Sequence, residues 1–444
     1  MHRGNPIINK YLKVLHVSTS FGKSSAGYRL HEALLQEKEI DSFCFVENTS
    51  LDDIRIIKYY ENIITRIKKT FFIKVENIII NKLYKNRINL PFSLALFSSK
   101  KLVRQINNIN PDIVHLHWIC GGFMKIDDIS KIKSPIVLSL HDQWGYTGGC
   151  HIVAELVPKF NSECCYNVDE MCNKYTENCG TCGVLRSKKK KDLSFYILQK
   201  KKKIFSRIKS MTIVGVSKWM TDCAGESTVF KGKKIFFLPN PINTNVFKRI
   251  DKIQSRILWN LPVNKKLILF GAKNATSTPY KGYKLLMEAL NKISSENIEC
   301  VVFGSNKPKN IKKNPYEIHY IGYLNDVESL VTLYNACDVM VHPSMREAFG
   351  LTAAESLSCG TPVIAFGHSG LLDIIDHKKN GYLAEPFDTT DLANGIDWVL
   401  NNENYDELSK NAREKVVREF DYDIVAKKYI TLYQTIFQYQ DEQQ

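Results

Sequence analysis

The chain has 444 residues, of which 44% are hydrophobic and 24% charged, so its composition is that of a globular protein and excludes a largely disordered one. Lysine and arginine total 61 against 46 acidic residues, a formal charge of +15, which indicates an anionic partner without choosing between nucleic acid, a phosphorylated small molecule and an anionic membrane. No apolar run is long enough to span a membrane, and Lys10, Lys13 and His16 interrupt the N-terminal segment where a signal peptide is apolar, so we expect a cytoplasmic protein.

Short apolar runs alternate with amphipathic segments along the whole chain. The runs that predict strands are Val14–Ser18, Asp41–Val46, Ile113–Trp118, Ile136–Leu140, Thr212–Val216, Ile235–Leu238, Leu267–Phe270, Glu299–Phe303, Ile318–Tyr323, Val339–His342 and Pro362–Phe366. The helical patterns between them include Gly27–Gln36, Ser99–Ile109, Tyr283–Ile293, Val327–Cys337, Ala348–Cys359 and Asp391–Leu400. Buried strands joined by crossover helices predict parallel sheets with both faces covered. Because the pattern occurs twice, we predict an α/β protein of two doubly wound domains, with ligands bound between them at the carboxyl ends of the strands.

The Pro-Asn-Pro-rich stretch Pro239–Asn245 marks the predicted domain junction. We expect an N-terminal, acceptor-binding domain over residues 1–245, with a cysteine-rich insertion at 150–182, and a second domain over residues 246–420. Residues 421–444 predict a C-terminal helix that packs back on the first domain.

The stretch Arg346–Ile375 has the most informative pattern. Glu347 and Glu355 flank the predicted start of a helix near Gly350. The first backbone N–H groups there are those of Phe349, Gly350, Leu351 and Thr352. They form an anion site, because glycine lets the backbone approach a diphosphate and the helix dipole favours its charge. An isolated pair of glutamates can simply be solvated at a helix N-terminus, but the surrounding pattern E-x-F-G-L-T-x-x-E-x-x-x-C-G-T-P-V-I-A favours a binding site.

This segment resembles the family-4 retaining glycosyltransferases of the GT-B fold, specifically over Val339–Asp373 and more weakly over nearly the whole chain. Asn240–Pro241 resembles the family's turn into the second domain, and Tyr280–Leu290 resembles its Lys-Gly segment. The resemblance implies a GT-B fold, with two doubly wound Rossmann-like domains facing a central cleft.

The resemblance also implies roles for single residues of the second domain. Lys281 is implied as the contact to the donor diphosphate, Glu355 as the ribose ligand and Glu347 as the contact to the donor sugar. The backbone of Phe349–Thr352 would complete the phosphate cradle. Family members usually have an arginine after the first strand of this domain, where the chain has Lys273, a point charge that lacks the bidentate fork of arginine.

On the first domain, Gly22 in STSFGKSSAG resembles the glycine that approaches the nucleotide sugar, although a Gly-Ser turn after a strand needs no function. His141 ends a predicted strand and resembles the histidine that faces the donor sugar in retaining members, so we place it with Glu347 among the catalytic residues. His115 and His117 lie on one face of a strand by alternation, and they either line the same cleft or cap a core.

Four cysteines of the insertion follow the spacing C-x21-C-x6-C-x2-C, and they are Cys150, Cys172, Cys179 and Cys182. A C-x2-C turn presents two thiolates to one tetrahedral metal, and a reducing compartment disfavours disulfides. A structural zinc is one interpretation, and a set of free or redox-active thiols is the other. Cys164 and Cys165 lie in an extra stretch and are not expected to be ligands. No D-x-D pattern marks a catalytic metal, and none is expected.

Two lysine runs, Lys188–Lys191 and Lys200–Lys203, flank the apolar segment Leu193–Leu198. One interpretation is a basic amphipathic helix on the anionic inner face of the cell membrane, which suits a lipid-linked acceptor. The other is a solvated helix with an apolar stripe that faces the core. Nucleic acid is not the expected partner, because no recognition motif accompanies the charge.

We therefore predict a retaining glycosyltransferase that moves a hexosyl unit from a nucleotide-diphosphate sugar to a glycan or lipid-linked acceptor. The expected role is cell-surface polysaccharide biosynthesis, such as that of capsule, exopolysaccharide or O-antigen. The first alternative is a nucleotide-sugar epimerase of similar two-domain fold, which would convert its substrate without an acceptor. A zinc-containing nucleic-acid-binding protein is the less favoured alternative, because it leaves Glu347 and Glu355 without a purpose.

Overall fold

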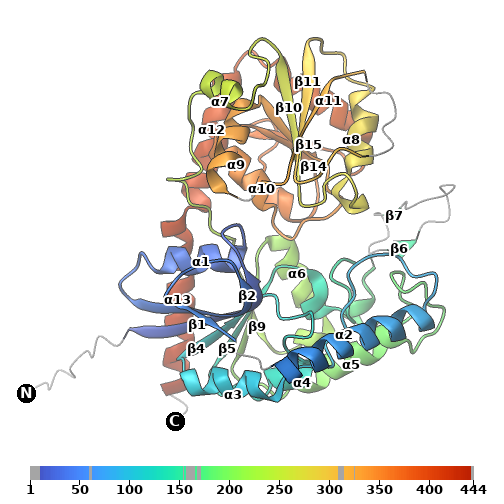
Figure 1. The fold of residues 1–444 in the computed structure, drawn as a ribbon, viewed down its shortest axis with the longest axis vertical. Coiled ribbons are helices and arrows are strands. Elements are labelled where there is room, and N and C mark those ends of the chain that lie inside the picture. The colour runs from blue at the N-terminus through green and yellow to red at the C-terminus, as the bar shows by residue number, and fades with distance from the viewer. Residues whose placement is uncertain are drawn as a thin grey trace, which may run out of the picture.

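The computed structural model of the protein describes residues 11–59, 63–153, 155–156, 166–167, 172–308, 315–324 and 326–441. Two domains lie one above the other, and each is built on a parallel sheet with helices packed around it (Figure 1). The predicted pair of parallel sheets is therefore confirmed. A short antiparallel pair in the insertion consists of β6 (Glu155–Leu156) and β7 (Tyr166–Asn167).

The first domain has a seven-stranded sheet in the order β3-β2-β1-β4-β5-β8-β9. Its strands are β1 (Leu12–Phe21), β2 (Ile40–Thr49), β3 (Ile56–Lys58), β4 (Ile113–Leu116), β5 (Ile136–Leu140), β8 (Met211–Gly215) and β9 (Lys234–Phe237). Its helices are α1 (Ala26–Leu34), α2 (Ile63–Leu83), α3 (Lys100–Ile109), α4 (Ile126–Ile129), α5 (Leu193–Phe205) and α6 (Lys218–Glu226), with short 3-10 helices η1 (Gln143–Tyr146), η2 (Lys174–Thr176) and η3 (Thr228–Phe230). The central strands β4 and β5 are buried along their whole length, which is why their sequences are continuously apolar rather than alternating.

The second domain has a six-stranded sheet in the order β12-β11-β10-β13-β14-β15. Its strands are β10 (Lys266–Gly271), β11 (Ile298–Phe303), β12 (Ile318–Gly322), β13 (Val339–His342), β14 (Val363–Phe366) and β15 (Gly381–Ala384). Its helices are α7 (Lys252–Leu258), α8 (Tyr283–Leu290), α9 (Val327–Ala336), α10 (Leu351–Ser358), α11 (Thr389–Leu400) and α12 (Tyr405–Glu419), with η4 (Pro279–Lys281) and η5 (Ser369–Asp373). The strand order reverses between β1 and β4 in one sheet and between β10 and β13 in the other, and such reversals open a ligand crevice beyond the strand ends.

The chain crosses between the domains twice, and the two crossings lie side by side. Ile242 and Asp421 form a parallel bridge. The N–H of Ile242 donates to the Phe420 carbonyl at 2.8 Å, and the N–H of Tyr422 donates to the Ile242 carbonyl at 3.1 Å. These bonds fasten the two connecting segments to each other.

The last helix, α13 (Tyr422–Asp441), returns to the first domain and packs along α1 (Figure 1). Its buried side chains Val425, Tyr429 and Tyr433 share one core with residues of β1 and α1. The Tyr422 hydroxyl also donates to Glu32 of α1 at 3.1 Å. The first domain is thus built from two distant parts of the chain.

The lysine-flanked segment forms α5, and its apolar side belongs to the core. Ile197, Leu198 and Phe205 are buried. Lys201 is fully buried as well, with its ammonium 3.7 Å from the centre of the Trp144 ring, and burial lowers its pKa to about 7. The structure therefore favours the core-facing interpretation of this segment over the membrane-facing one. Across the described residues, we find no helix with both the length and the apolar character of a membrane span.

Candidate functional site

A cleft of about 440 Å³ opens between the two domains. It is lined from the first domain by the end of β1, the start of α1 and the residues that follow β4 and β5, and from the second domain by the loops after β10 and β13. The predicted site residues in its lining are His141, Lys273, Lys281, Glu347, Phe349, Gly350, Leu351 and Thr352. The structure therefore brings together most of the residues that the sequence singled out, and Lys273 lies among them with an exposed side chain.

The N-terminus of α10 opens into this cleft. Gly350 precedes the helix with a φ of 108°, and no side chain caps it. A Cβ at this position would lie 2.7 Å from a methyl group of Leu371, so both the backbone conformation and the packing require glycine. The first N–H groups of the helix have no capping acceptor, and they form a site for an anion at the cleft wall.

Lys281 and Glu347 form an ion pair on the same wall. The Lys281 ammonium lies 2.5 Å from Oε1 of Glu347. The adjoining Gly282 has a φ of 76°, and a Cβ there would lie 1.9 Å from the Pro343 carbonyl oxygen. The position after Lys281 therefore requires glycine. Burial opposes the charge of Glu347, but Lys281 and His342 outweigh it and hold the pKa of Glu347 below its usual value. The cleft thus holds a carboxylate and an ammonium ion next to the uncapped helix.

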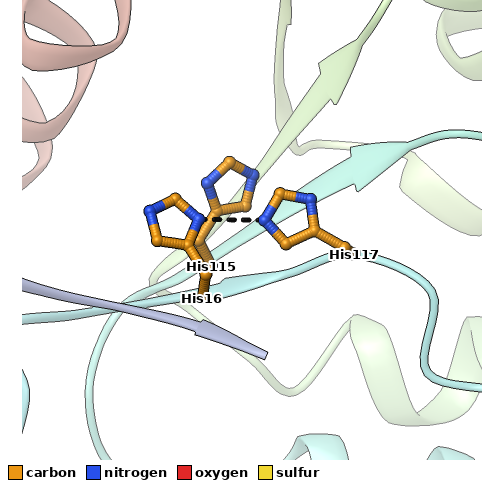
Figure 2. A group of neighbouring side chains, drawn as sticks. All are labelled: His16, His115 and His117. Atoms are coloured by element: carbon orange, nitrogen blue, oxygen red, sulfur yellow. Dashed lines mark hydrogen bonds between the residues drawn. The ribbon is translucent and has the colours of Figure 1, made fainter. Parts of the chain in front are cut away.

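A row of histidines runs from the cleft into the first domain. His16 on β1 and His115 on β4 are register partners, and Figure 2 shows His16 Nδ1 hydrogen-bonded to His117 Nε2 at 2.9 Å. His117 Nδ1 is in turn 2.9 Å from Nε2 of His141, which lines the cleft. Burial lowers the pKa of His141 to about 4 and the pKa values of His16, His115 and His117 well below the usual value, so the row is neutral at pH 7.

His115 and His117, which the alternation placed on one face, have different surroundings. His117 lines the cleft, whereas both ring nitrogens of His115 are hydrogen-bonded at 2.7 Å, to Tyr433 and to Ser139. One nitrogen each of His16, His115 and His117 lies within 4.8 Å of the others, a spacing that a metal site also requires. Both nitrogens of His115 and of His117 and Nδ1 of His16 already serve hydrogen bonds within the protein, and only Nε2 of His16 has no partner among the described residues. We therefore interpret the row as a hydrogen-bonded network rather than a metal site.

Gly22 does not line the cleft. It lies in the turn before α1, where an added Cβ would meet nothing within 4 Å. The glycine at which a Cβ would clash is Gly27, 2.7 Å from Phe21 and 2.9 Å from His117. Gly27 therefore gives α1 its close approach to the cleft, and the sequence offered no signal to prefer it over Gly22.

Glu355 is also outside the cleft lining, and it is only 3% exposed. It forms an ion pair with Arg29 of α1 and accepts a 2.6 Å hydrogen bond from Tyr334. The Arg29–Glu355 pair joins the two domains across their interface. In this arrangement the carboxylate expected to hold a ribose is occupied by a side chain of the other domain.

A second pocket, of about 290 Å³, adjoins the cleft, and we call it the aromatic pocket. It shares Trp118, His141, Lys281, Glu347 and Ala348 with the cleft. Its further lining includes the rings of Trp219 and Tyr280, together with Arg346, Asp142 and His151. Nη1 of Arg346 is buried and has no partner among the described residues. This pocket could not be predicted from the sequence, because its aromatic residues come from segments far apart in the chain.

The four cysteines of the insertion line neither pocket. Cys150, Cys172, Cys179 and Cys182 surround a separate small cavity in the first domain. Cys164 and Cys165 lie outside the described residues.

Residues 253–415 match the family model described as "Glycosyl transferases group 1". An uncharacterized glycosyltransferase of Methanocaldococcus jannaschii is 30% identical over 192 residues, which are 41% of this chain and 48% of that protein. The N,N'-diacetylbacillosaminyl-diphospho-undecaprenol alpha-1,3-N-acetylgalactosaminyltransferase of Campylobacter jejuni is 25% identical over 193 residues, which are 42% of this chain and 50% of that protein. The chain thus spans about half the length of the curated relatives that it matches.

The solved structure of sucrose-phosphate synthase from Thermosynechococcus elongatus aligns over 96% of this chain and 99% of its own, with a TM-score of 0.64 and 18% sequence identity. At this identity the likeness shows the fold, and it confirms the predicted GT-B architecture. The family match covers the domain that contains Lys281, Glu347 and α10. The second domain therefore matches the glycosyl transferases group 1 in sequence, and the two domains together have the GT-B fold.

Proposed function

We propose that this protein is a retaining glycosyltransferase that moves a hexosyl unit from a nucleotide-diphosphate sugar to a glycan or lipid-linked acceptor. The observation that supports this most directly is that the cleft and the aromatic pocket adjoin and share His141, Lys281 and Glu347. A donor in the cleft and an acceptor in the aromatic pocket would meet at these three side chains.

The donor's diphosphate fits the positive groups of the cleft. The uncapped N-terminus of α10 supplies backbone N–H groups, and Lys281 supplies an ammonium ion close by. Lys273 lies in the same lining and adds a second cation. Because these groups can neutralise the charge that develops on the leaving diphosphate, the proposal includes no catalytic metal.

In the proposed reaction, a hydroxyl oxygen of the acceptor forms a bond to the anomeric carbon as the bond from that carbon to the phosphate oxygen breaks. The departing oxygen keeps the bonding electrons and receives the proton of the acceptor hydroxyl. When both oxygens lie on the same face of the sugar, the anomeric configuration is retained. Glu347, ionised beside Lys281, would face the sugar ring and stabilise the positive charge that develops on it.

The acceptor side of the site suits a sugar that bears a phosphate. Aromatic rings stack on sugar faces, and Trp118, Trp219 and Tyr280 provide such rings in the aromatic pocket. Arg346 lies in the same pocket with one guanidinium nitrogen unpartnered among the described residues, and a guanidinium group recognises phosphate well. The Campylobacter jejuni relative is named for a sugar joined to diphospho-undecaprenol, which supports a lipid-linked acceptor here too.

Helix α2 supports a position at the anionic inner face of the cell membrane, where lipid-linked precursors of cell-surface polysaccharides are found. Six of its apolar side chains are more than half exposed, and they are Ile63, Ile64, Ile67, Phe71, Ile78 and Leu83. The helix also contains five basic residues, Arg66, Lys68, Lys69, Lys74 and Lys82, against the single acidic residue Glu76. A helix of this composition lies in a membrane interface with its basic groups at the anionic headgroups.

Thermal unfolding in the presence of UDP-, GDP-, ADP- and dTDP-sugars tests the donor proposal, because a ligand that binds only the native state raises its stability. We expect one nucleotide class to raise the melting temperature. The purified protein with that donor and a lipid-linked or glycan acceptor should then form a glycosylated product. Conversion of the donor sugar in the absence of any acceptor would instead identify an epimerase.

A further inference from the structure

The cysteine-rich insertion holds four thiols around one cavity in the first domain. This cavity of about 10 Å³ is lined by Cys150, Cys172, Cys179 and Cys182 together. A volume of about 10–15 Å³ on this measure admits one water-sized sphere, so the space suits a single small ion. Cys150 lies at one end of the insertion, and Cys172, Cys179 and Cys182 lie close together in sequence at its other end.

The distance between two of the sulfurs matches a metal site. Sγ of Cys150 and Sγ of Cys182 are 3.8 Å apart. No three of the four described cysteines have all their sulfurs within 4.8 Å of one another, so a bound ion has to draw the remaining thiols inward. A tetrahedral zinc with bonds of about 2.3 Å to sulfur has edges of about 3.8 Å between its ligands. A disulfide needs about 2.05 Å, and no disulfide joins the cysteines that the structure describes.

The turn that contains Cys179 and Cys182 is held in an unusual backbone conformation. Cys179, Gly180 and Thr181 have φ values of 54°, 93° and 42°. A Cβ at Gly180 would lie 2.0 Å from the Lys190 carbonyl oxygen, so the turn depends on this glycine. The N–H of Cys182 donates to Asp192 at 2.9 Å, and Asp192 caps α5. The turn is thereby fixed to a helix with both thiols at the cavity.

Positive groups adjoin the cavity. Lys174 is part of its lining, and the fully buried Lys201 interacts electrostatically with Cys150 and Cys179. The Lys201 ammonium donates to the Thr147 carbonyl at 3.0 Å, three residues before Cys150. A zinc ion with four thiolates has a net charge of −2, and these two lysines beside it would stabilise that charge. A metal centre would thus give a reason for a buried lysine that the glycosyltransferase site does not use.

We propose that Cys150, Cys172, Cys179 and Cys182 bind one structural Zn²⁺. Four thiolates fill a tetrahedral site and leave no open position, so the ion would serve structure rather than catalysis. The ion would link Cys172, Cys179 and Cys182 to Cys150. The next residue, His151, lies 2.6 Å from Asp142, and both line the aromatic pocket. The proposal is independent of the enzyme's donor and acceptor.

Metal analysis of the full chain, purified without chelators from zinc-supplemented cells, tests the proposal. We expect about one zinc per chain, because the four thiolates make one site. Thiol modification should release that zinc into a colorimetric chelator. Zinc far below one per chain, or a disulfide between these cysteines in the freshly purified protein, would overturn the proposal.

Cysteine-to-alanine variants test whether these four residues bind the metal. Cys182→Ala and Cys150→Ala should lose most of the zinc, whereas Cys44→Ala, which removes a buried thiol of β2, should retain it. Since a ligand variant can fail to fold, the wild-type chain refolded with Co²⁺ gives a second measurement. A thiolate-to-cobalt charge-transfer band together with the visible absorption of tetrahedral cobalt would support the site, and octahedral cobalt absorption alone would contradict it.

Discussion

Lys281 and Glu347 carry opposite charges in the same cleft, so each determines what the other can bind. With its ammonium 2.5 Å from the carboxylate, Lys281 reduces the repulsion that Glu347 would exert on a diphosphate. Its position depends on Gly282 and on the Pro343 carbonyl behind it. The motif around Glu347 can be recognised in the sequence. The ion pair between Lys281 and Glu347 cannot be predicted from it, since 66 positions separate the two residues.

Replacing Lys281 with methionine keeps the apolar stem of the side chain and removes the charge. We expect nucleotide-sugar affinity to fall by roughly 10- to 100-fold, because a hydrogen bond to a charged group contributes about 1.5–3 kcal/mol. Isothermal titration calorimetry with the donor found in the thermal screen measures this change. Lys284→Met, on the exposed side of α8, is the matched control and should leave affinity unchanged. Equal affinities for both variants would remove Lys281 from the donor site.

The buried histidines predict loss of stability in mild acid. Burial lowers the pKa of His141 to about 4, below its value of about 6.5 in the unfolded chain, so the unfolded state binds more protons between these values. Stability is therefore full above about pH 6.5 and declines as the pH falls toward 4. His141 alone should remove roughly 2 kcal/mol at pH 5, and His16, His115 and His117 add to the loss in the same direction.

Urea unfolding at pH 7.5, 6 and 5 measures how the free energy of unfolding declines with pH. His115→Gln should flatten this decline, because one titrating group is removed, even where the substitution lowers stability at pH 7.5. The same pH dependence in His115→Gln as in the wild type would show that this histidine does not contribute. His319→Gln is a suitable control, since this histidine pairs with Glu299 in the second domain, away from the row.

At the scale of helices and strands, the apolar runs located the eleven predicted strands, because buried parallel strands are short, apolar and separated by helices. The strands β3 and β15 of the two parallel sheets were not predicted, since Ile56–Lys58 and Gly381–Ala384 are short edge strands with no long apolar run. Helix α5 shows more clearly that composition alone does not predict which side chains are buried. Its lysines indicated a solvated or membrane-bound surface, but Lys201 packs on Trp144, 57 positions earlier, and no local pattern shows that contact.

Helix α2 predicts binding to anionic membranes. Phe71→Glu places a charge on the exposed apolar face of α2 and should abolish sedimentation with vesicles that contain anionic phospholipid. Tyr196→Glu adds the same charge at an exposed aromatic residue of α5 and should leave sedimentation unchanged. Vesicles of neutral phospholipid should bind the wild type much less, and salt should weaken the binding. Equal loss of binding in both variants would indicate a net-charge effect instead of a docking helix.

At the scale of the whole molecule, Arg29 and Glu355 connect the domains through an ion pair of which both members are nearly inaccessible, at 2% and 3% exposed. The sequence could not predict this pair, because its members are 326 positions apart and belong to different domains. Only the relative position of α1 and α10 brings them together. The pair also holds Glu355 away from the cleft, so a role for this carboxylate in ribose binding requires Arg29 to release it.

Removing one member of this pair should therefore destabilise the protein strongly. Arg29→Met or Glu355→Gln alone should cost about 3–5 kcal/mol, since an uncompensated polar or charged partner stays buried, and the double variant should recover part of the loss. Urea unfolding of the three variants gives the coupling energy. The exposed Arg55–Asp41 pair, treated in the same way, should yield no more than about 1 kcal/mol. A coupling energy near zero for Arg29 and Glu355 would show that the domains separate freely in solution.

The return of α13 to the first domain has a consequence for how the protein is made. During synthesis most of the first domain emerges early, yet Val425, Tyr429 and Tyr433, which complete its core against β1 and α1, leave the ribosome only after the whole second domain. The second domain, whose strands and helices are contiguous in the chain, can finish folding before the first. Until α13 emerges, the growing chain exposes the apolar surface that this helix covers. Stop codons between residues 421 and 441 should thus produce chains that depend on chaperones even though the second domain is intact.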